Sequence, residues 1–127
     1  MSTGPWAIIY NHMVAYPDLT DAELDRLFRA LADATRRDIV ARVLTGEQSI
    51  STLAARYDMS FAAVQKHVAV LERAGLVSKS PQGRERLVRG NPERIARARQ
   101  LLRRLEEIWR SRFGQLDDVL SQPSQQD

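Results

Sequence analysis

The chain has 127 residues, of which 43% are hydrophobic and 28% charged, and it contains no cysteine. These values predict one compact soluble domain in a reducing compartment, the cytoplasm, and they exclude disulfides, thiolate zinc sites and a cysteine nucleophile. No apolar run is long enough to span a bilayer, and the N-terminal sequence lacks the basic start and the long apolar segment of a signal peptide.

Residues 1–19 show no clear hydrophobic period and are interpreted as an N-terminal extension. The sequence leaves open whether this extension is ordered, and whether Met1 or Met13 is the first residue of the protein. Thr20 and Glu23 then form a capping box, which predicts a first helix running to about Asp33. The apolar side chains of this helix recur at helical spacing, at Leu24, Leu27, Phe28 and Leu31.

A second capping box, Thr35 with Asp38, predicts a helix that carries an apolar stripe and ends at Gly46. The stripe is formed by Ile39, Val40, Val43 and Leu44. Ser51 is predicted to open the next, shorter helix, "STLAARYD". A turn at 58–59 leads to Ser60, the predicted N-cap of a further helix that Gly75 ends. Two short helices joined by so tight a turn are typical of a helix-turn-helix.

The segment after Gly75 changes from helical to β-compatible. Two such runs flank Pro81-Gln82-Gly83, which predicts a hairpin turn at these three residues. The tip and second strand of this hairpin are basic, with Lys79, Arg84, Arg86 and Arg89. Asn91 and Pro92 predict the start of a long last helix that reaches about Leu120, followed by a polar tail over 121–127.

The positive charge of the chain is concentrated in one region. Residues 66–112 hold 13 basic and 5 acidic side chains, net +8, whereas residues 1–65 hold 6 basic and 8 acidic ones, net −2. Residues 113–127 hold three acidic side chains and no basic one. This distribution indicates a surface that faces a polyanion, although a solvated helix face is the better explanation for the arginines between 97 and 104.

The helix that begins after Ser60 has a stripe interpreted as buried and an unusual outer face. Phe61, Val64, Val68 and Leu71 are assigned to packing by their spacing. The outer face carries small residues and donors: Ala62, Ala63, Gln65 and Lys66. Small side chains allow a helix to approach base edges in a major groove, glutamine can pair with adenine, and lysine can donate to guanine or phosphate. The free backbone N–H groups beside Ser60 favour a phosphate. The alternative, that both alanines pack against another helix, is weakened by the basic hairpin.

Four segments together resemble the ArsR-type winged helix-turn-helix repressors: "LFRALADATRRDIV", "LAARYDMSFAAVQKHVAVLERAGLV", the "GRERLV" of the hairpin, and the Trp109, Phe113 and Leu116 pattern of the last helix. The resemblance covers roughly residues 20–120. It implies a homodimeric transcriptional repressor. It also implies that the DNA-facing positions are Ser60, Ala62, Ala63, Gln65, Lys66 and His67 on the helix, with Arg84 and Arg86 in the wing. For His67 a boundary histidine with a partner inside the chain is nearly as good an interpretation, and the resemblance favours the contact with DNA.

The resemblance places the dimer interface on the first and last helices. The apolar arc of the last helix is also too wide for one small core to cover. The residues expected to pair across a two-fold axis are Leu24, Leu27, Phe28, Leu101, Leu105, Ile108 and Trp109.

The cysteine-based metal site of many ArsR-type proteins is missing from this sequence. The helix that often carries a Cys-x-Cys pair reads "STLAARYD", and the only histidines are His12 and His67. Adjacent acidic pairs such as Glu106-Glu107 diverge on a helix. We therefore expect no metal, no cofactor and no enzymatic activity.

The sequence thus predicts a mainly α fold with a small β-hairpin, a winged helix-turn-helix whose DNA-binding and dimerisation domain spans 20–120. We expect it to bind an inverted-repeat DNA operator through helix 60–73 in the major groove and wing 76–90, as a homodimer with no membrane partner. The alternatives are a winged helix that binds another protein, and a sensor of the same family with an unknown small-molecule inducer. Repression and activation are not distinguished by the sequence.

Overall fold

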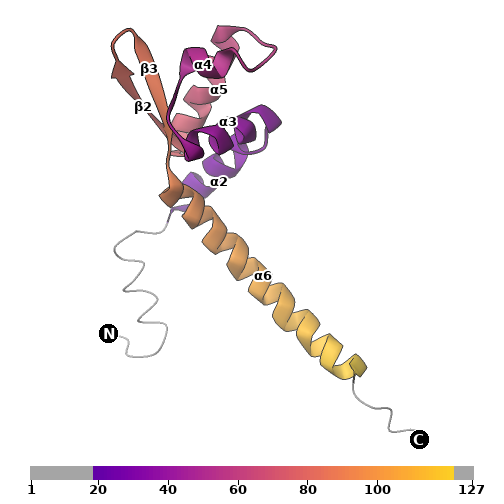
Figure 1. Ribbon diagram of the computed structural model, residues 1–127. Coiled ribbons are helices and arrows are strands. Elements are labelled where there is room, and N and C mark those ends of the chain that lie inside the picture. Colours follow the sequence, from indigo (N-terminus) through magenta and orange to yellow (C-terminus); the bar gives the residue numbers. More distant parts are fainter. Residues whose placement is uncertain (1–18, 122–127) are drawn as a thin grey trace, which may run out of the picture. The chain divides into compact units, whose positions relative to one another are not determined.

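The computed structural model describes residues 19–121, apart from the side chains of residues 115–119 and 121. The chain divides into two compact units, one ending at Arg97 and one starting at Ala98. The elements are α2 (Asp21–Ala30), α3 (Ala34–Thr45), β1 (Gln48–Ser49), α4 (Ile50–Ala54), α5 (Phe61–Arg73), β2 (Val77–Gln82), β3 (Glu85–Gly90) and α6 (Pro92–Ser121) (Figure 1). The predicted fold class is confirmed. Most of the expected N-terminal extension, residues 1–18, and the tail from residue 122 lie outside the described residues.

Three predicted helix starts are confirmed by their caps. Thr20 and Glu23 form the reciprocal capping box of α2, with Glu23 N donating to Thr20 Oγ1 at 3.1 Å and Thr20 N to Glu23 Oε1 at 2.9 Å. Ser60 caps α5 by accepting from the backbone N–H of Ala63 at 3.1 Å. Asn91 accepts from the backbone of the first turn of α6, which starts at Pro92.

Two other predicted caps are wrong by two residues. The N-cap of α3 is Asp33, whose carboxylate accepts from Arg36 N, and not Thr35. The backbone N–H of Arg36 lowers the pKa of Asp33, as it would for a carboxylate at a helix N-terminus. The cap of α4 is Ser49, which accepts from Thr52 N, and not Ser51. α2 ends at Ala30, with Leu31 as its C-cap, rather than at about Asp33, which has extended backbone as the cap of α3.

The core of the first unit is formed by the facing sides of its helices and the sheet. Fully buried side chains come from α2, α3, α4 and α5, from the turn after α5 and from β3, and they include Leu27, Leu53, Val64, Val68, Leu71 and Leu76. On α3 the stripe is only partly confirmed, because Ile39, Val40 and Val43 are buried while Leu44 is 40% exposed. The recognition-like helix α5 is thus anchored along one face by three apolar side chains.

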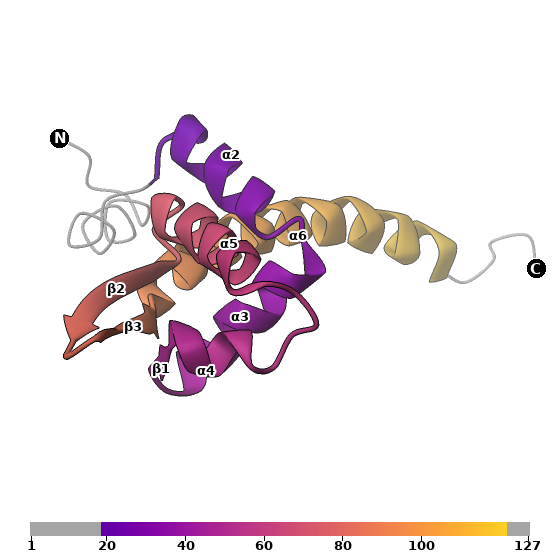
Figure 2. The ribbon, with the colours of Figure 1, turned by 90° about the horizontal axis from the view of Figure 1, so that it is seen from above.

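The sheet has three antiparallel strands in the order β1-β3-β2, and the short strand β1 was not predicted. Gln82 pairs with Glu85, so the hairpin turn consists of Gly83 and Arg84, with Gly83 at φ 62°. The expected turn at Pro81 is wrong: Pro81 lies inside β2. This edge strand tolerates it because one side of its backbone pairs with no strand of the described residues. The β2–β3 hairpin projects from the helices in both views (Figure 1, Figure 2).

Gly75 ends α5 as predicted. It has φ 76°, a conformation that costs least for glycine. The N–H of Leu76 bonds to Leu71 O at 3.0 Å and the N–H of Gly75 to Glu72 O at 2.9 Å, the pair of bonds of a Schellman motif. The side chain of Asn91 donates to Gly75 O at 3.0 Å, so the same residue that caps α6 also holds the end of α5.

Candidate nucleic-acid interface

The outer face of α5 carries the expected DNA-facing residues. Ala62, Gln65 and Lys66 are exposed, and so is Ser60 just before the helix. Ala63 is half-buried, so only part of its methyl group is accessible. Lys66 has no ion-pair or hydrogen-bond partner for its side chain in the described part of the chain. Because Val64, Val68 and Leu71 fix the opposite face in the core, these side chains are presented outward by a rigid element.

Phe61 differs from its sequence-based assignment. It was assigned to packing with Val64, Val68 and Leu71, but 47% of it is exposed whereas the other three are fully buried. The helical period extends the stripe back to position 61, yet Phe61 is the first residue of α5, where the helix passes the edge of the core. Phe61 therefore belongs to the accessible surface, and a period read from sequence alone could not show where the core ends.

His67 is bound from inside the chain. Its Nδ1 lies 3.3 Å from an Arg36 guanidinium nitrogen and 3.9 Å from the Asp33 carboxylate. Arg36 in turn donates to the carbonyls of Ala30 and Arg29. The half-buried His67 thus connects α5 to the junction of α2 and α3. This is the geometry of the boundary-histidine interpretation, and a contact of the ring with DNA stays a prediction.

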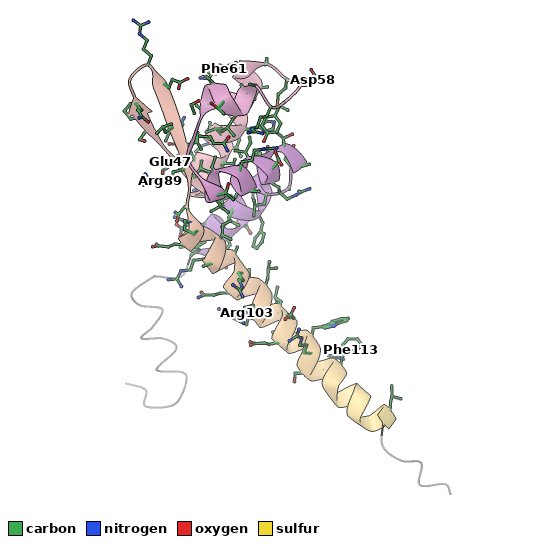
Figure 3. All side chains as sticks on the ribbon, in the orientation of Figure 1. Glu47, Asp58, Phe61, Arg89, Arg103 and Phe113 are labelled. Atoms are coloured by element: carbon green, nitrogen blue, oxygen red, sulfur yellow. The ribbon has the colours of Figure 1, made fainter. Side chains whose placement is uncertain are left out.

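The basic residues of the hairpin fall into two groups. At its base, Lys79 pairs with Glu72 of α5 at 3.3 Å, and Arg89 pairs with Glu47 at 3.2 Å (Figure 3). Arg84 in the turn and Arg86 beside it are exposed and have no side-chain partner among the described residues. The first group fastens the hairpin to α5 and to the segment between α3 and β1. The second group leaves two positive charges for an external anion.

The hairpin turn and the start of α5 lie at the same end of the first unit. Phe61 is seen at that end, near the level of the turn between β2 and β3 (Figure 3). The start of α5 and the hairpin turn, whose arginines are unpaired among the described residues, therefore lie at one end of this unit. A helix with small outer side chains, followed by a positively charged hairpin, suits a DNA duplex. The major groove accepts a helix, and the phosphate backbone carries negative charge.

A polar cluster supports the turn between α4 and α5. The Tyr57 hydroxyl donates to Asp38 Oδ2, and Arg42 Nε donates to the same oxygen at 2.8 Å. The Tyr57 hydrogen bond, followed by that of Arg42, holds the pKa of Asp38 below its ordinary value. Burial, followed by the neighbouring Asp38, raises the pKa of Tyr57. The turn that precedes the recognition helix is thus tied to α3 by a charge-assisted hydrogen bond.

Tyr57→Phe should lower the free energy of unfolding by about 1 kcal/mol at pH 7, because it removes this hydrogen bond. Asp38 has a lowered folded-state pKa, so its contribution is complete above the ordinary value of 3.8 and is lost as the pH falls below it. The stability gap between wild type and Tyr57→Phe should therefore narrow from pH 5 to pH 3. Thermal melting at a series of pH values measures it. In an Asp38→Asn background the gap should no longer change with pH, and a gap that persists unchanged at pH 3 in the wild-type background would contradict the assignment.

Other kinds of site have little support in the described residues. No group of three or more His, Cys, Asp or Glu side chains among them is placed to hold a metal ion. No helix in residues 19–121 is long and apolar enough to cross a membrane. What these residues do form is a helix-turn-helix followed by a β-hairpin with unpaired arginines at its tip. That arrangement defines the class of winged helix-turn-helix DNA-binding proteins.

Comparison with known proteins identifies the family. The family model of a helix-turn-helix domain matches residues 31–79. The HTH-type transcriptional regulator Rv2034 of Mycobacterium tuberculosis is 37% identical over 94 residues, covering 74% of this chain and 88% of the relative. The ArsR family transcriptional regulator RHA00566 superposes with a TM-score of 0.69 at 32% identity, covering 74% of this chain and 97% of that structure. An ArsR-like transcriptional regulator from Rhodococcus sp. RHA1 gives a TM-score of 0.66 at 33% identity, covering 77% and 92%.

The chain belongs to the ArsR family of winged helix-turn-helix regulators. It is a DNA-binding regulator of transcription, as the resemblance implied.

Proposed function

We propose that the chain is a homodimeric repressor that binds an inverted-repeat operator, with α5 in the major groove and the β2–β3 wing on the flanking backbone. It acts in the cytoplasm by binding alone, without catalysis. Residues 20–120 serve as one functional DNA-binding and dimerisation domain. The observation that carries this proposal is the outer face of α5, small at Ala62 and polar at Gln65 and Lys66, together with Arg84 and Arg86 of the hairpin, which are unpaired among the described residues.

The role of each side chain in DNA binding follows from its exposure and its partners within the chain. Gln65 and Lys66 are exposed on the helix that enters the groove, so they contact base edges or phosphate. Arg84 and Arg86 contact phosphate or the minor groove and position the protein without reading much sequence. The Ser60 hydroxyl caps α5 and so orders its first turn. In this way Ser60 contributes to DNA binding, because the backbone N–H groups of that turn face a phosphate.

The dimer is supported by the second unit. On α6 the side chains of Leu102, Leu105, Ile108, Trp109 and Phe113 are each 40–62% exposed, and Leu101 is half-buried. A face of this kind on a free surface is typical of an interface. Trp109 and Phe113 also contact each other, with ring centroids 4.0 Å apart and ring planes tilted by 35°, which gives the face a preformed aromatic pair. On α2, Leu24 and Phe28 are half-buried and remain in the proposed interface. Leu27 does not, because it is fully buried within the single chain and serves its core.

The wing is tested by the salt dependence of binding. Arg84→Ala or Arg86→Ala should weaken binding to all duplexes alike. Each should reduce the slope of log affinity against log salt by about one, because each removes one phosphate contact. Fluorescence anisotropy over a salt series, on an operator selected from random DNA and on a random duplex, gives both slopes.

Arg89→Ala is the matched control for this measurement. It removes one positive charge from the same hairpin, but that charge is already paired with Glu47. Its slope should stay close to that of wild type. An unchanged slope in Arg84→Ala and Arg86→Ala, with affinity lost for one sequence only, would mean that these arginines read bases. Weak, salt-insensitive binding by the wild type would favour a protein partner over DNA.

A further inference from the structure

An exposed aromatic ring stands at the start of the recognition helix. Phe61 is the first residue of α5 and is 47% exposed, so nearly half of its surface is open to water, whereas Val64, three residues later, is fully buried. Its ring stacks on no other aromatic ring among the described residues; the ring pair found there is Trp109 with Phe113. The exposed part of the ring forgoes the free energy that burial would give it, so the fold of the single chain explains only part of this side chain.

The neighbours of Phe61 show what the ring would meet in a duplex. Ala62, next to it, is exposed and small, so the backbone of α5 can come close to the floor of a groove. Gln65 lies one turn further on, at the i+4 position, where two side chains on a helix are adjacent. The first turn of a recognition helix is the part that reaches base edges. The ring is therefore beside the amide that is best suited to an adenine.

The major groove offers one apolar group for such a ring, the C5 methyl group of thymine. We propose that Phe61 is a specificity-determining residue that packs its ring on the methyl group of one thymine in each half-site, beside the base pair contacted by Gln65. This inference rests on the proposed operator binding. The contact selects thymine over cytosine without a hydrogen bond, because cytosine has no methyl group at C5.

The test removes the methyl group and nothing else. An operator selected from random DNA by the wild-type dimer is resynthesised with each thymine replaced in turn by deoxyuridine, which keeps the base pairing. Each half-site should contain one thymine whose replacement lowers the wild-type affinity about fourfold, the effect of one lost methyl contact. With both half-sites changed the loss should be about fifteenfold.

Two variants assign the contact to the ring. Phe61→Ala should bind the thymine and deoxyuridine operators equally well at that position. Gln65→Ala, the matched control on the same face, should bind more weakly but keep the wild-type sensitivity to the methyl group. The melting temperature of Phe61→Ala should stay close to that of the wild type, because Phe61 is 47% exposed and lies outside the fully buried core.

The outcomes separate this inference from the proposed function. A wild type that selects no DNA sequence overturns the proposed function. A wild type that binds its operator with steep salt dependence, but with equal affinity for every deoxyuridine version, overturns the thymine contact alone. A Phe61→Ala variant that stays sensitive to the methyl group, or that melts well below the wild type, also overturns it, since another residue or the core would then account for the observation.

Discussion

Replacing Leu105 and Ile108 together with glutamine should convert the dimer to a monomer and weaken operator binding by at least about a hundredfold. Both side chains are more than half exposed on α6, at 53% and 62%, beside Trp109 at 61%. A dimer holds two α5 helices on one operator, and joining two binding modules raises affinity by about 10²–10⁴ over one module. Glutamine favours helix and carries no charge, so the change acts on the apolar face and not on the electrostatic attraction to DNA. Sedimentation velocity gives the mass, and anisotropy on the selected operator gives the affinity.

Glu107→Gln is the control for this double substitution. Position 107 is two residues from Leu105, so it lies on the opposite side of α6, and it is exposed. The variant should remain dimeric and bind the operator at least as tightly as the wild type. The interface assignment is wrong if the Leu105 and Ile108 variant still sediments as a dimer, or if the wild type is itself a monomer at micromolar concentration.

The sequence was sufficient for those features that depend on neighbouring residues. The caps at Thr20, Ser60 and Asn91 and the end of α5 at Gly75 were all predicted, because each requires a few residue types at fixed spacing. The order of helices and hairpin follows from these boundaries together with the apolar periods.

The sequence could not decide between two candidate helix caps that lie close together in the chain. Asp33 and Thr35 can both cap a helix, and so can Ser49 and Ser51. Which one does so depends on where the preceding segment is held by the rest of the fold. Ser49, for example, also belongs to β1, whose pairing with β3 is a contact between segments far apart in the chain. Short strands of this kind leave no period to detect.

The candidate interface was predicted in part. The outward direction of Ala62, Gln65 and Lys66 follows from the helical period once Val64, Val68 and Leu71 are recognised as the buried stripe. The period could not show that Phe61 lies beyond the core. It also could not divide the basic hairpin residues into paired and unpaired ones, because Glu47 and Glu72, which neutralise Arg89 and Lys79, come from other elements.

Ala62→Leu should weaken operator binding by about 5- to 150-fold while leaving stability nearly unchanged. Ala62 is exposed, and a substitution on such a surface changes the free energy of unfolding by about 0.5 kcal/mol or less. In the groove the added methylene groups would hold α5 away from the base edges. The loss of one good base contact costs about 1–3 kcal/mol. Ala63→Leu is a poorer test, because Ala63 is half-buried and the larger side chain would also disturb packing.

Ala41→Leu provides the same chemical change at an exposed position of α3, outside the proposed interface. It should melt and bind the operator as the wild type does, so that any loss in Ala62→Leu reports on position 62 and not on an added leucine. Thermal melting and operator binding are measured on all three proteins. If Ala62→Leu melts well below both others, Ala62 is packed in the folded protein. If it melts normally and binds normally, α5 does not approach the bases at this position. Only normal melting with weakened binding fits a helix whose outer face is small because it enters the groove.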